Sequence, residues 1–396
     1  MSTSAARERM VELARAEGFA LAGFAPADEM GEPRAAALAA HKAGHLAGMA
    51  WMAPDWLARA TSPGTFLPGA HTVMILALPC HAPDPIAPRS PVLSPQSSTP
   101  GPSRGRVARY ARGRDYHRVF EKKLRRIARA MRDELGAAAR ATVDYGPLLE
   151  RPPAALAGLG WAGKSTMLLL PGFGPWVMLG AIATDLEVAP GAPLRKSCGT
   201  CQRCLVACPT GALSPGGHVL DARLCISYHT IENRGPIPRE LRPRFGDWIF
   251  GCDECLDSCP VGAGRFESHP DFAAARFDDA FPPLSELLAL DEAGFAERFG
   301  GRAIMRAKRD GLLRNACVAL GNVGTGADLA ALIAALEDPS PLVRGHAGWA
   351  LGQLGNREGR AAEARAALEA RLAMEDDPFV RGELAEALAS FSRSQP

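Results

Sequence analysis

The sequence predicts an α+β protein in three parts: an N-terminal α/β domain over residues 1–190, a small cysteine-rich module over 191–275, and a C-terminal domain of helical repeats over 276–396. Three observations lead to this division. Helical and strand patterns alternate through the first part. Most cysteines gather in the second part, and an apolar stripe with helical spacing recurs in the third. A chain of 396 residues is long enough for two or three such domains.

The first eighty residues alternate between helices and strands. Apolar residues at helical spacing predict helices over 5–17 and around 34–43, and short β-forming runs predict strands over 20–24 and 71–78. The second of these strands is continuously apolar, so we expect it to be buried. Residues 81–104 are rich in proline and serine, a composition that cannot bury enough apolar surface to order itself. We expect a mobile loop there.

The same alternation continues to residue 190. A basic amphipathic helix is predicted over 116–135, followed by a strand that ends at 142–144 and a helix over 154–159. Two apolar runs, 165–170 and 176–183, are separated by a Pro- and Gly-containing turn. This pattern predicts a hairpin.

The cysteine-rich module has the spacing of a protein that holds two iron–sulfur clusters. Eight of the ten cysteines lie within 62 residues, as Cys198-x2-Cys201-x2-Cys204-x3-Cys208-Pro209, then Cys225, then Cys252-x2-Cys255-x3-Cys259-Pro260. In such runs the fourth cysteine, before a proline, ligates the other cluster. The first [4Fe–4S] cluster is therefore assigned to Cys198, Cys201, Cys204 and Cys259. The second is assigned to Cys208, Cys252, Cys255 and, by elimination, Cys225.

Two alternatives remain for these cysteines. Paired C-x2-C motifs also bind zinc, although zinc sites have no use for a repeated Cys-Pro end. Disulfides are scarce in the reducing cytosol. We expect a cytosolic protein, because the first ten residues lack the apolar stretch of a secretory signal and no run of 18 apolar residues could span a membrane.

The C-terminal domain repeats. Leu312, Ala316, Ala319, Leu320 and Val323 form an apolar stripe that recurs 31 residues later, and both copies end in Ala-Leu-Gly-x-x-Gly. A third copy begins at residue 380. Helix pairs that repeat in this way stack into an α-solenoid of the HEAT type, which is usually a scaffold or a binding surface.

The net charge is only +2, but the basic residues are unevenly distributed. Between Arg104 and Arg132 there are twelve Lys or Arg residues against two acids. Composition alone favours a solvated basic helix. A phosphate-binding face is the alternative, since a basic stripe is typical of polyanion contact.

Two segments resemble known ligand-binding motifs only in part. Residues 158–165 fit both the Walker A pattern and the dinucleotide-binding pattern, yet a helix is predicted before them and a strand after them, the reverse of what either site needs. We expect these glycines to let the backbone approach a large flat ligand. Asp115-Tyr-His117 begins like the D-x-H-x2-G signature of cobalamin proteins, but Phe120 stands where glycine is required. His117 is therefore not expected to ligate cobalt.

Taken together, motifs over most of residues 50–355 resemble those of one family, the tRNA epoxyqueuosine reductases. The motifs are Arg109-Tyr-Ala-Arg-Gly-Arg-Asp-Tyr-His117, Val143-Asp-Tyr-Gly-Pro-Leu-Leu-Glu-Arg151 with Gly158 to Lys164, Cys225-Ile-Ser-Tyr228, Ile231 to Pro238, Phe250-Gly-Cys-Asp-Glu-Cys255, Ala303-Ile304, Lys308-Arg309 and Leu313-Arg-Asn315. Arg112 replaces a family tryptophan, Val261-Gly262 replaces Trp-Asn, and Tyr145 replaces a small residue. None of these departures touches an assigned cluster ligand.

The resemblance implies an enzyme that uses cobalamin and two [4Fe–4S] clusters to reduce epoxyqueuosine to queuosine at the tRNA wobble position. It implies that reduced cobalt, Co(I), performs the hard chemistry. The resemblance also implies an external low-potential donor of electrons and, as the partner, tRNA bearing epoxyqueuosine. We expect a monomer.

The resemblance also implies site residues. Asp144 matches the family's acid, and its place at the end of an apolar strand should raise its carboxyl pKa, although a plain turn Asp is the alternative. Further implied residues are Arg59, Tyr110, Asp144, Lys164 and Ser227 toward cobalamin, and His117 and Arg239 toward the substrate.

Two other functions share the cofactor pattern. A cobalamin-dependent reductive dehalogenase would act on a small halogenated molecule, but such enzymes are commonly exported and membrane-linked. A ferredoxin-like electron carrier would leave the first 190 residues without a purpose. Cobalt content separates the carrier from the enzymes, and tRNA binding separates the two enzymes.

Overall fold

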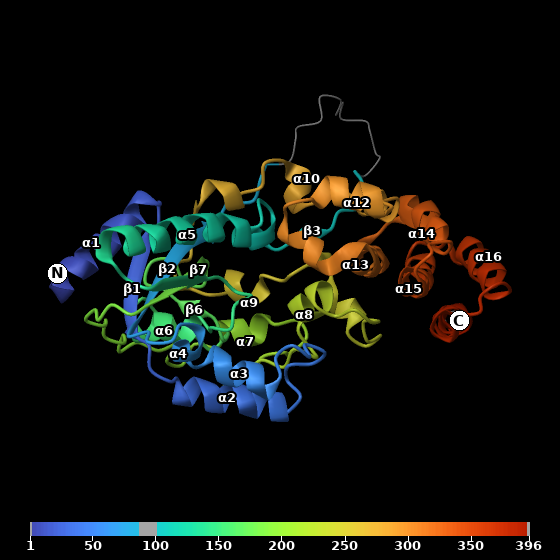
Figure 1. Ribbon diagram of the computed structural model, residues 1–396. Coiled ribbons are helices and arrows are strands. Elements are labelled where there is room, and N and C mark those ends of the chain that lie inside the picture. The colour runs from blue at the N-terminus through green and yellow to red at the C-terminus, as the bar shows by residue number, and fades with distance from the viewer. Residues whose placement is uncertain (1, 87–100, 394–396) are drawn as a thin grey trace. The chain divides into compact units, whose positions relative to one another are not determined.

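The computed structural model describes residues 2–86 and 101–393 (Figure 1). The chain forms two compact units, each assembled from separate stretches. The first unit comprises Met1–Pro83, Arg114–Arg223 and Asp253–Ala273. The second comprises Asp84–Gly113, Leu224–Cys252 and Ala274–Pro396. The sequence division at residues 190 and 275 stays a prediction. Most of the expected Pro-rich loop, residues 87–100, lies outside the described residues.

The first unit is built on an antiparallel sheet. Its helices and strands are α1 (Thr3–Ala16), β1 (Leu21–Pro26), α2 (Gly31–Lys42), α3 (Pro54–Ala60), α4 (Pro63–Phe66), β2 (Thr72–His81), α5 (Tyr116–Leu135), β4 (Ala139–Thr142), α6 (Arg151–Leu156), β5 (Trp161–Ala162), β6 (Leu168–Leu169), β7 (Val177–Thr184), α7 (Arg203–Ala207), α9 (Glu254–Asp257), β9 (Glu267–Ser268) and η3 (Pro270–Phe272). The strand order is β1-β2-β7-β4, and β9 extends the sheet at the end of β2. All ten residues of β2 are buried, as its continuous apolar run predicted.

Helices cover both faces of this sheet (Figure 1). A Cβ on Gly180 would meet Phe120 and Leu124 of α5, whereas a Cβ on Gly23 would meet Leu159 just after α6. The register aligns Gly23 with Ile75 and Gly180 with Leu76, so these glycines lie on opposite faces. The α5 helix therefore packs on one face and α6 on the other.

The basic helix α5 has the predicted bounds. Its buried side chains recur at spacings of three and four residues, from Tyr116 through Val119, Phe120 and Leu124. The Asp115 carboxylate caps its N-terminus, and Gly136 ends it in the left-handed conformation with φ of 62°.

The predicted hairpin over 165–183 is wrong. β6 pairs with β5, while β7 pairs with β2 and β4 inside the main sheet. Both runs are apolar because both are buried, and local sequence could not reveal that their partners lie elsewhere in the chain.

The second unit is mainly helical. Its elements are β3 (Arg106–Val107), η1 (Arg109–Ala111), α8 (Ile226–Ile231), η2 (Arg242–Phe245), β8 (Trp248–Phe250), α10 (Phe277–Ala280), α11 (Leu284–Leu288), α12 (Glu292–Phe299), η4 (Ala303–Ala307), α13 (Lys308–Val323), η5 (Gly326–Asp328), α14 (Leu329–Ala335), α15 (Pro341–Arg357), α16 (Ala361–Leu372) and α17 (Pro378–Arg393). β3 and β8 form a parallel pair.

The helical repeats are confirmed. The helices α13, α15 and α17 carry the three apolar stripes, and α15 packs against the other two. Glycines permit the close approach: a Cβ on Gly321 would lie 2.4 Å from the Trp349 ring. The predicted α+β class with a C-terminal repeat domain is thus confirmed. Within the described part of the chain, no helix has the length and apolarity needed to cross a membrane.

Candidate functional site

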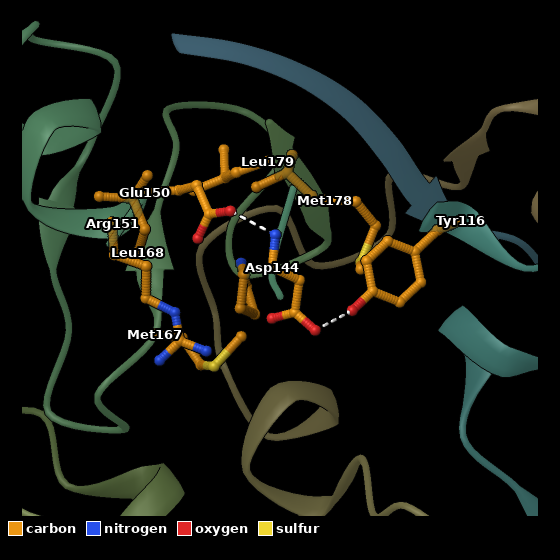
Figure 2. A pocket seen from close by; sticks show the side chains of 10 residues that line it. Tyr116, Asp144, Glu150, Arg151, Met167, Leu168, Met178 and Leu179 are labelled. Carbon is orange, nitrogen blue, oxygen red and sulfur yellow. Dashed lines mark hydrogen bonds between the residues drawn. The ribbon is translucent and has the colours of Figure 1, made fainter. Parts of the chain in front are cut away.

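Asp144 occupies a strained turn just beyond β4. Its φ is 50°, in the left-handed region that side chains seldom adopt. The backbone N–H of Asp144 donates a hydrogen bond of 2.5 Å to Oε1 of Glu150, the N-cap residue of α6 (Figure 2). The Glu150 carboxylate thus contacts the backbone of Asp144 on one side, while the Asp144 side chain points toward Tyr116 on the other (Figure 2).

Two side chains from the first turn of α5 converge on the Asp144 carboxylate. The Tyr116 hydroxyl donates a hydrogen bond of 2.6 Å to Oδ2 (Figure 2). His117 Nε2 lies 3.2 Å from the same oxygen. His117 Nδ1 lies 2.7 Å from Oδ1 of Asp115. Since Asp115 also caps the helix, the fold of α5 fixes the imidazole between two carboxylates.

A pocket of about 110 Å³ opens beside this cluster. Its wall combines polar and apolar groups, namely Tyr116, Asp144, Glu150, Arg151, Met167, Leu168, Pro175, Val177, Met178 and Leu179. Apolar walls with a few convergent polar groups are typical of sites that bind and orient a small reacting group.

The ionisable groups of this cluster are strongly perturbed. Burial acts to lower the pKa of His117, but the hydrogen bonds with Asp115 and Asp144 raise it to about 9. Burial, reinforced by the charge of Asp144, raises the pKa of Glu150 to about 7. Perturbed groups that gather beside a pocket are typical of a functional site.

The expectation that the pKa of Asp144 is raised is wrong. Burial does act to raise the pKa, but the hydrogen bonds from His117 and Tyr116 outweigh it and hold the pKa below its ordinary value. The cluster at neutral pH is therefore an Asp144 carboxylate beside a His117 imidazolium.

The environment of His117 agrees with the failed cobalamin motif. Both ring nitrogens are engaged by carboxylates, so neither is available as a cobalt ligand.

The first cysteine set is brought together by the fold. Burial raises the pKa of the Cys259 thiol, and the thiols of Cys198, Cys204 and Cys201 raise it further. A thiol from the second run thus lies among the three of the first, which fits the thiolate chemistry of a [4Fe–4S] cluster. Among residues 2–86 and 101–393, no group of three or more His, Cys, Asp or Glu side chains has the arrangement of a single-ion site.

Of the cysteines assigned to the second cluster, Cys208 and Cys255 belong to the first unit, and Cys225 and Cys252 belong to the second. Cys225 is the N-cap of α8, and Cys252 follows shortly after β8.

The other predicted site residues have varied surroundings. Lys164 Nζ donates a hydrogen bond of 2.8 Å to the carbonyl of Gly199, beside the Cys198 run. Arg59 is exposed at the end of α3, Tyr110 lies in η1, and Ser227 lies in the first turn of α8. Their roles stay predictions, as do those of Asp144 and His117, the two that the structure brings into contact.

Arg239 is held by acidic side chains. Its Nε lies 3.0 Å from Oε2 of Glu383, and its Nη1 lies 3.5 Å from Oε2 of Glu386. Both glutamates are on α17. A phosphate would have to compete with these carboxylates for its guanidinium.

Sequence reasoning did not assign roles to Tyr116, Asp115 or Glu150. The Asp115-Tyr-His117 run was noted as a failed cobalamin motif and as the end of the family motif 109–117, with a role expected only for His117. Glu150 stands in the quoted motif 143–151, six residues after Asp144, yet nothing in the spacing reveals that its carboxylate accepts from the Asp144 backbone.

Two glycines of the segment 158–165 lie against other parts of the protein backbone. A Cβ on Gly158 would lie 2.4 Å from the Ala192 carbonyl, and one on Gly160 would lie 2.4 Å from the Leu169 carbonyl. These two glycines let protein backbones pass each other. The expectation that this segment approaches a flat ligand stays a prediction.

The basic segment divides into two halves. Its first half is paired: Arg104 with Asp278, Arg106 with Asp247, and both Arg109 and Arg112 with Asp84. The second half lies on α5, where Arg118, Lys122, Arg125, Arg126, Arg129 and Arg132 are exposed.

Comparisons with known proteins agree with the resemblance. Residues 61–145 match the family described as epoxyqueuosine reductase, residues 197–262 match a 4Fe-4S double cluster binding domain, and residues 302–389 match HEAT repeats. An epoxyqueuosine reductase of Xanthomonas campestris is 46% identical over 255 residues, which cover 64% of this chain and 71% of that protein.

Solved structures agree as well. A crystal structure of an epoxyqueuosine reductase with an epoxyqueuosine-modified tRNA stem loop has a TM-score of 0.89 and 30% identity, covering 99% of this chain and 100% of that one. The Bacillus subtilis enzyme, with its catalytic aspartate loop swung out of the active site, has a TM-score of 0.87 and 30% identity, covering 98% of this chain and all of that one. The protein therefore belongs to the epoxyqueuosine reductase family, cobalamin-dependent oxidoreductases of tRNA modification with two [4Fe–4S] clusters.

Proposed function

We propose that this protein reduces epoxyqueuosine to queuosine at the wobble position of tRNA, the last step of that modification. The observation that carries the proposal is the convergence of Tyr116 and His117 on the Asp144 carboxylate beside the pocket. The solved relative with its modified stem loop and the relative named for its catalytic aspartate loop both support the assignment of substrate and site.

The reaction fixes what the residues must do. Converting an epoxide to an alkene takes two electrons and two protons, and the oxygen leaves as water. Cobalamin, when bound, supplies a low-valent cobalt that accepts and transfers these electrons. The protein must orient the epoxide and bring a proton to its oxygen as the carbon–oxygen bonds break.

Asp144 is the proposed donor of that proton, through Oδ2. His117 holds the proton 3.2 Å from this oxygen and passes it to Asp144, and a proton from solvent restores His117 for the second transfer. Tyr116 donates to the same oxygen and fixes its direction. General acid catalysis of this kind contributes roughly 10²- to 10⁴-fold to a rate.

Electrons enter from an external low-potential donor and pass through the two clusters. Cys198, Cys201, Cys204 and Cys259 hold one cluster in this proposal. Cys208, Cys225, Cys252 and Cys255 hold the other. Arg59, Tyr110, Lys164, Ser227 and Asp144 are the proposed cobalamin contacts.

The proposed tRNA surface is the exposed side of α5. Lys122 and Arg129 are exposed there, and neither forms an ion pair with a described residue. The paired arginines before residue 113 and Arg239, held by two glutamates, are weaker candidates for phosphate contact. His117 would face the substrate base.

An anaerobic turnover assay tests the function. The protein, reconstituted with iron, sulfide and cobalamin, receives a low-potential reductant and tRNA bearing epoxyqueuosine. Mass spectrometry of the digested nucleosides then reports loss of one oxygen. Queuosine should form only when cobalamin is present, and Asp144→Asn should abolish it while both clusters and cobalamin stay bound.

Two outcomes would contradict the proposal. Full activity of Asp144→Asn would remove Asp144 from the chemistry. No turnover by the fully loaded wild-type protein would reject the tRNA substrate, and reduction of halogenated small molecules would then be assayed as the dehalogenase alternative.

A further inference from the structure

Two neighbouring side chains of the first repeat helix, α13, are buried in polar contacts. Arg314 and Asn315 are each 1% exposed. The Asn315 amide nitrogen donates to two backbone carbonyls, that of Thr230 in α8 at 2.9 Å and that of Ile249 in β8 at 2.8 Å. One amide therefore ties a helix and a strand that lie about twenty residues apart in the chain.

Arg314 supports the same arrangement. Its guanidinium donates to the carbonyls of His229, Asn233 and Gly235, and to Oδ1 of Asn315. Among the described residues it forms no ion pair, and burial lowers its pKa to about 9. A buried charge without a counter-ion is costly, so it persists only where its hydrogen bonds are all made in one geometry.

The carbonyls that these two side chains bind belong to the segments that carry two cysteines. Cys225 directly precedes α8, and Gly251 and Cys252 directly follow β8. Thr230 of α8 closes the network, because its hydroxyl accepts from the N–H of Gly251 at 2.9 Å and donates to the carbonyl of Ile226 at 2.8 Å. Hydrogen bonds thus run without a gap from α13 through α8 to the residue before Cys252.

We infer that Arg314 and Asn315 are positioning residues for the second iron–sulfur cluster, and that they hold the segments of Cys225 and Cys252 in the register that one cluster requires. The first repeat helix is then part of the cluster's support and not only a binding surface. The inference rests on the proposed assignment of Cys225 and Cys252 to one cluster.

We expect the loss of these contacts to affect the second cluster and not the first. The four cysteines assigned to the first cluster belong to the first unit, and none of them stands in a segment that Arg314 or Asn315 binds. Loss of the Asn315 amide leaves two buried carbonyls without their donor and removes one of the links between β8 and α8. The second cluster should then be lost or become labile while the first stays bound.

The variants are Asn315→Ala and Thr230→Val, with Asn322→Ala as the matched control. Asn322 lies two turns further along α13, and its amide also donates to two backbone carbonyls, those of Arg242 and Gly246, at 2.8 and 3.0 Å. Neither carbonyl lies next to an assigned ligand. Thr230→Val keeps the side-chain shape and removes only the hydroxyl, so it provides a second test if Asn315→Ala does not fold.

The readouts are iron and sulfide per chain after anaerobic reconstitution, electron paramagnetic resonance of the reduced protein, and thermal unfolding by circular dichroism. Wild type and Asn322→Ala should bind about eight irons, and Asn315→Ala and Thr230→Val about four, as one isolated cluster. Cys225→Ala serves as the reference for loss of the second cluster.

Each alternative result has a distinct meaning. Full iron and an unchanged spectrum in the folded Asn315→Ala and Thr230→Val proteins would overturn the inference. Equal losses in Asn322→Ala would do the same, because the effect would then be general destabilisation. Full iron in Cys225→Ala would instead reject the cysteine assignment, and the inference with it, while leaving the proposed reaction untouched.

Discussion

Removal of the Glu150 carboxylate should release Asp144 from the conformation that directs it toward the pocket. A left-handed conformation costs an ordinary residue roughly 1–2 kcal/mol. A hydrogen bond to an ionised group is worth about 1.5–3 kcal/mol. The bond from Asp144 N–H to Glu150 therefore offsets the strain at φ of 50°, and without it the turn relaxes.

The expected magnitude follows from these energies. Loss of about 1.5–3 kcal/mol corresponds to a change of roughly ten- to hundredfold in an equilibrium constant. Glu150→Ala should therefore lower kcat/KM by that factor. Glu150→Gln keeps an acceptor, and a neutral hydrogen bond contributes about 1 kcal/mol. It should therefore lose less activity than Glu150→Ala.

The pH dependence sharpens the test. Because the pKa of Glu150 is raised to about 7, its carboxylate is ionised above that pH and mostly protonated below it. The activity ratio of wild type to Glu150→Gln should therefore rise between about pH 6 and pH 8. The activity ratio is measured by single-turnover conversion of modified tRNA, with the iron and cobalamin occupancy of each protein as controls. Unchanged kcat/KM in Glu150→Ala, or a ratio that is flat with pH, would refute the reasoning.

Three further outcomes are expected. The folded-state pKa of His117 is raised from 6.5 to about 9, so the unfolding free energy should fall as pH rises through that interval, and His117→Asn should remove this slope in denaturant titrations at several pH values. Gly321→Ala should destabilise the repeat domain by about 1–3 kcal/mol, because its Cβ would overlap the Trp349 ring, and a Tm equal to wild type would contradict the packing. Replacing Lys122 and Arg129 by Glu should weaken tRNA binding and flatten its salt dependence, measured by filter binding, whereas unchanged affinity would exclude this face.

Local signals predicted much of the fold. The helix α5 has the expected bounds because its cap, its period and its terminal glycine all lie within or next to it. The repeat helices were predictable for the same reason, since each stripe lies within one helix. The strands of the hairpin were misassigned because β6 and β7 pair with segments far away in sequence.

The electrostatics could not be read from the sequence. Arg112 stood in a basic run that suggested phosphate binding, but the fold buries it and pairs it with Asp84, 28 residues earlier. The pKa of Asp144 was expected to rise because the strand before it is apolar. Its partners Tyr116 and His117 lie in the first turn of α5, and the rest of that helix and β4 separate them from Asp144 in the sequence. Their effect, which lowers the pKa of Asp144, therefore depends on tertiary structure alone.

The low pKa of Asp144 is compatible with its proposed role as an acid because burial affects the pKa values of Asp144 and His117 in opposite directions. Burial acts to raise the pKa of Asp144 and to lower that of His117, but their hydrogen bonds prevail, so the proton rests on His117. In the proposed reaction, cobalamin and the tRNA base would cover the pocket and exclude water, so that keeping the ion pair would cost more. The proton would then move toward Asp144 Oδ2, and the acid would form only once the epoxide is in place.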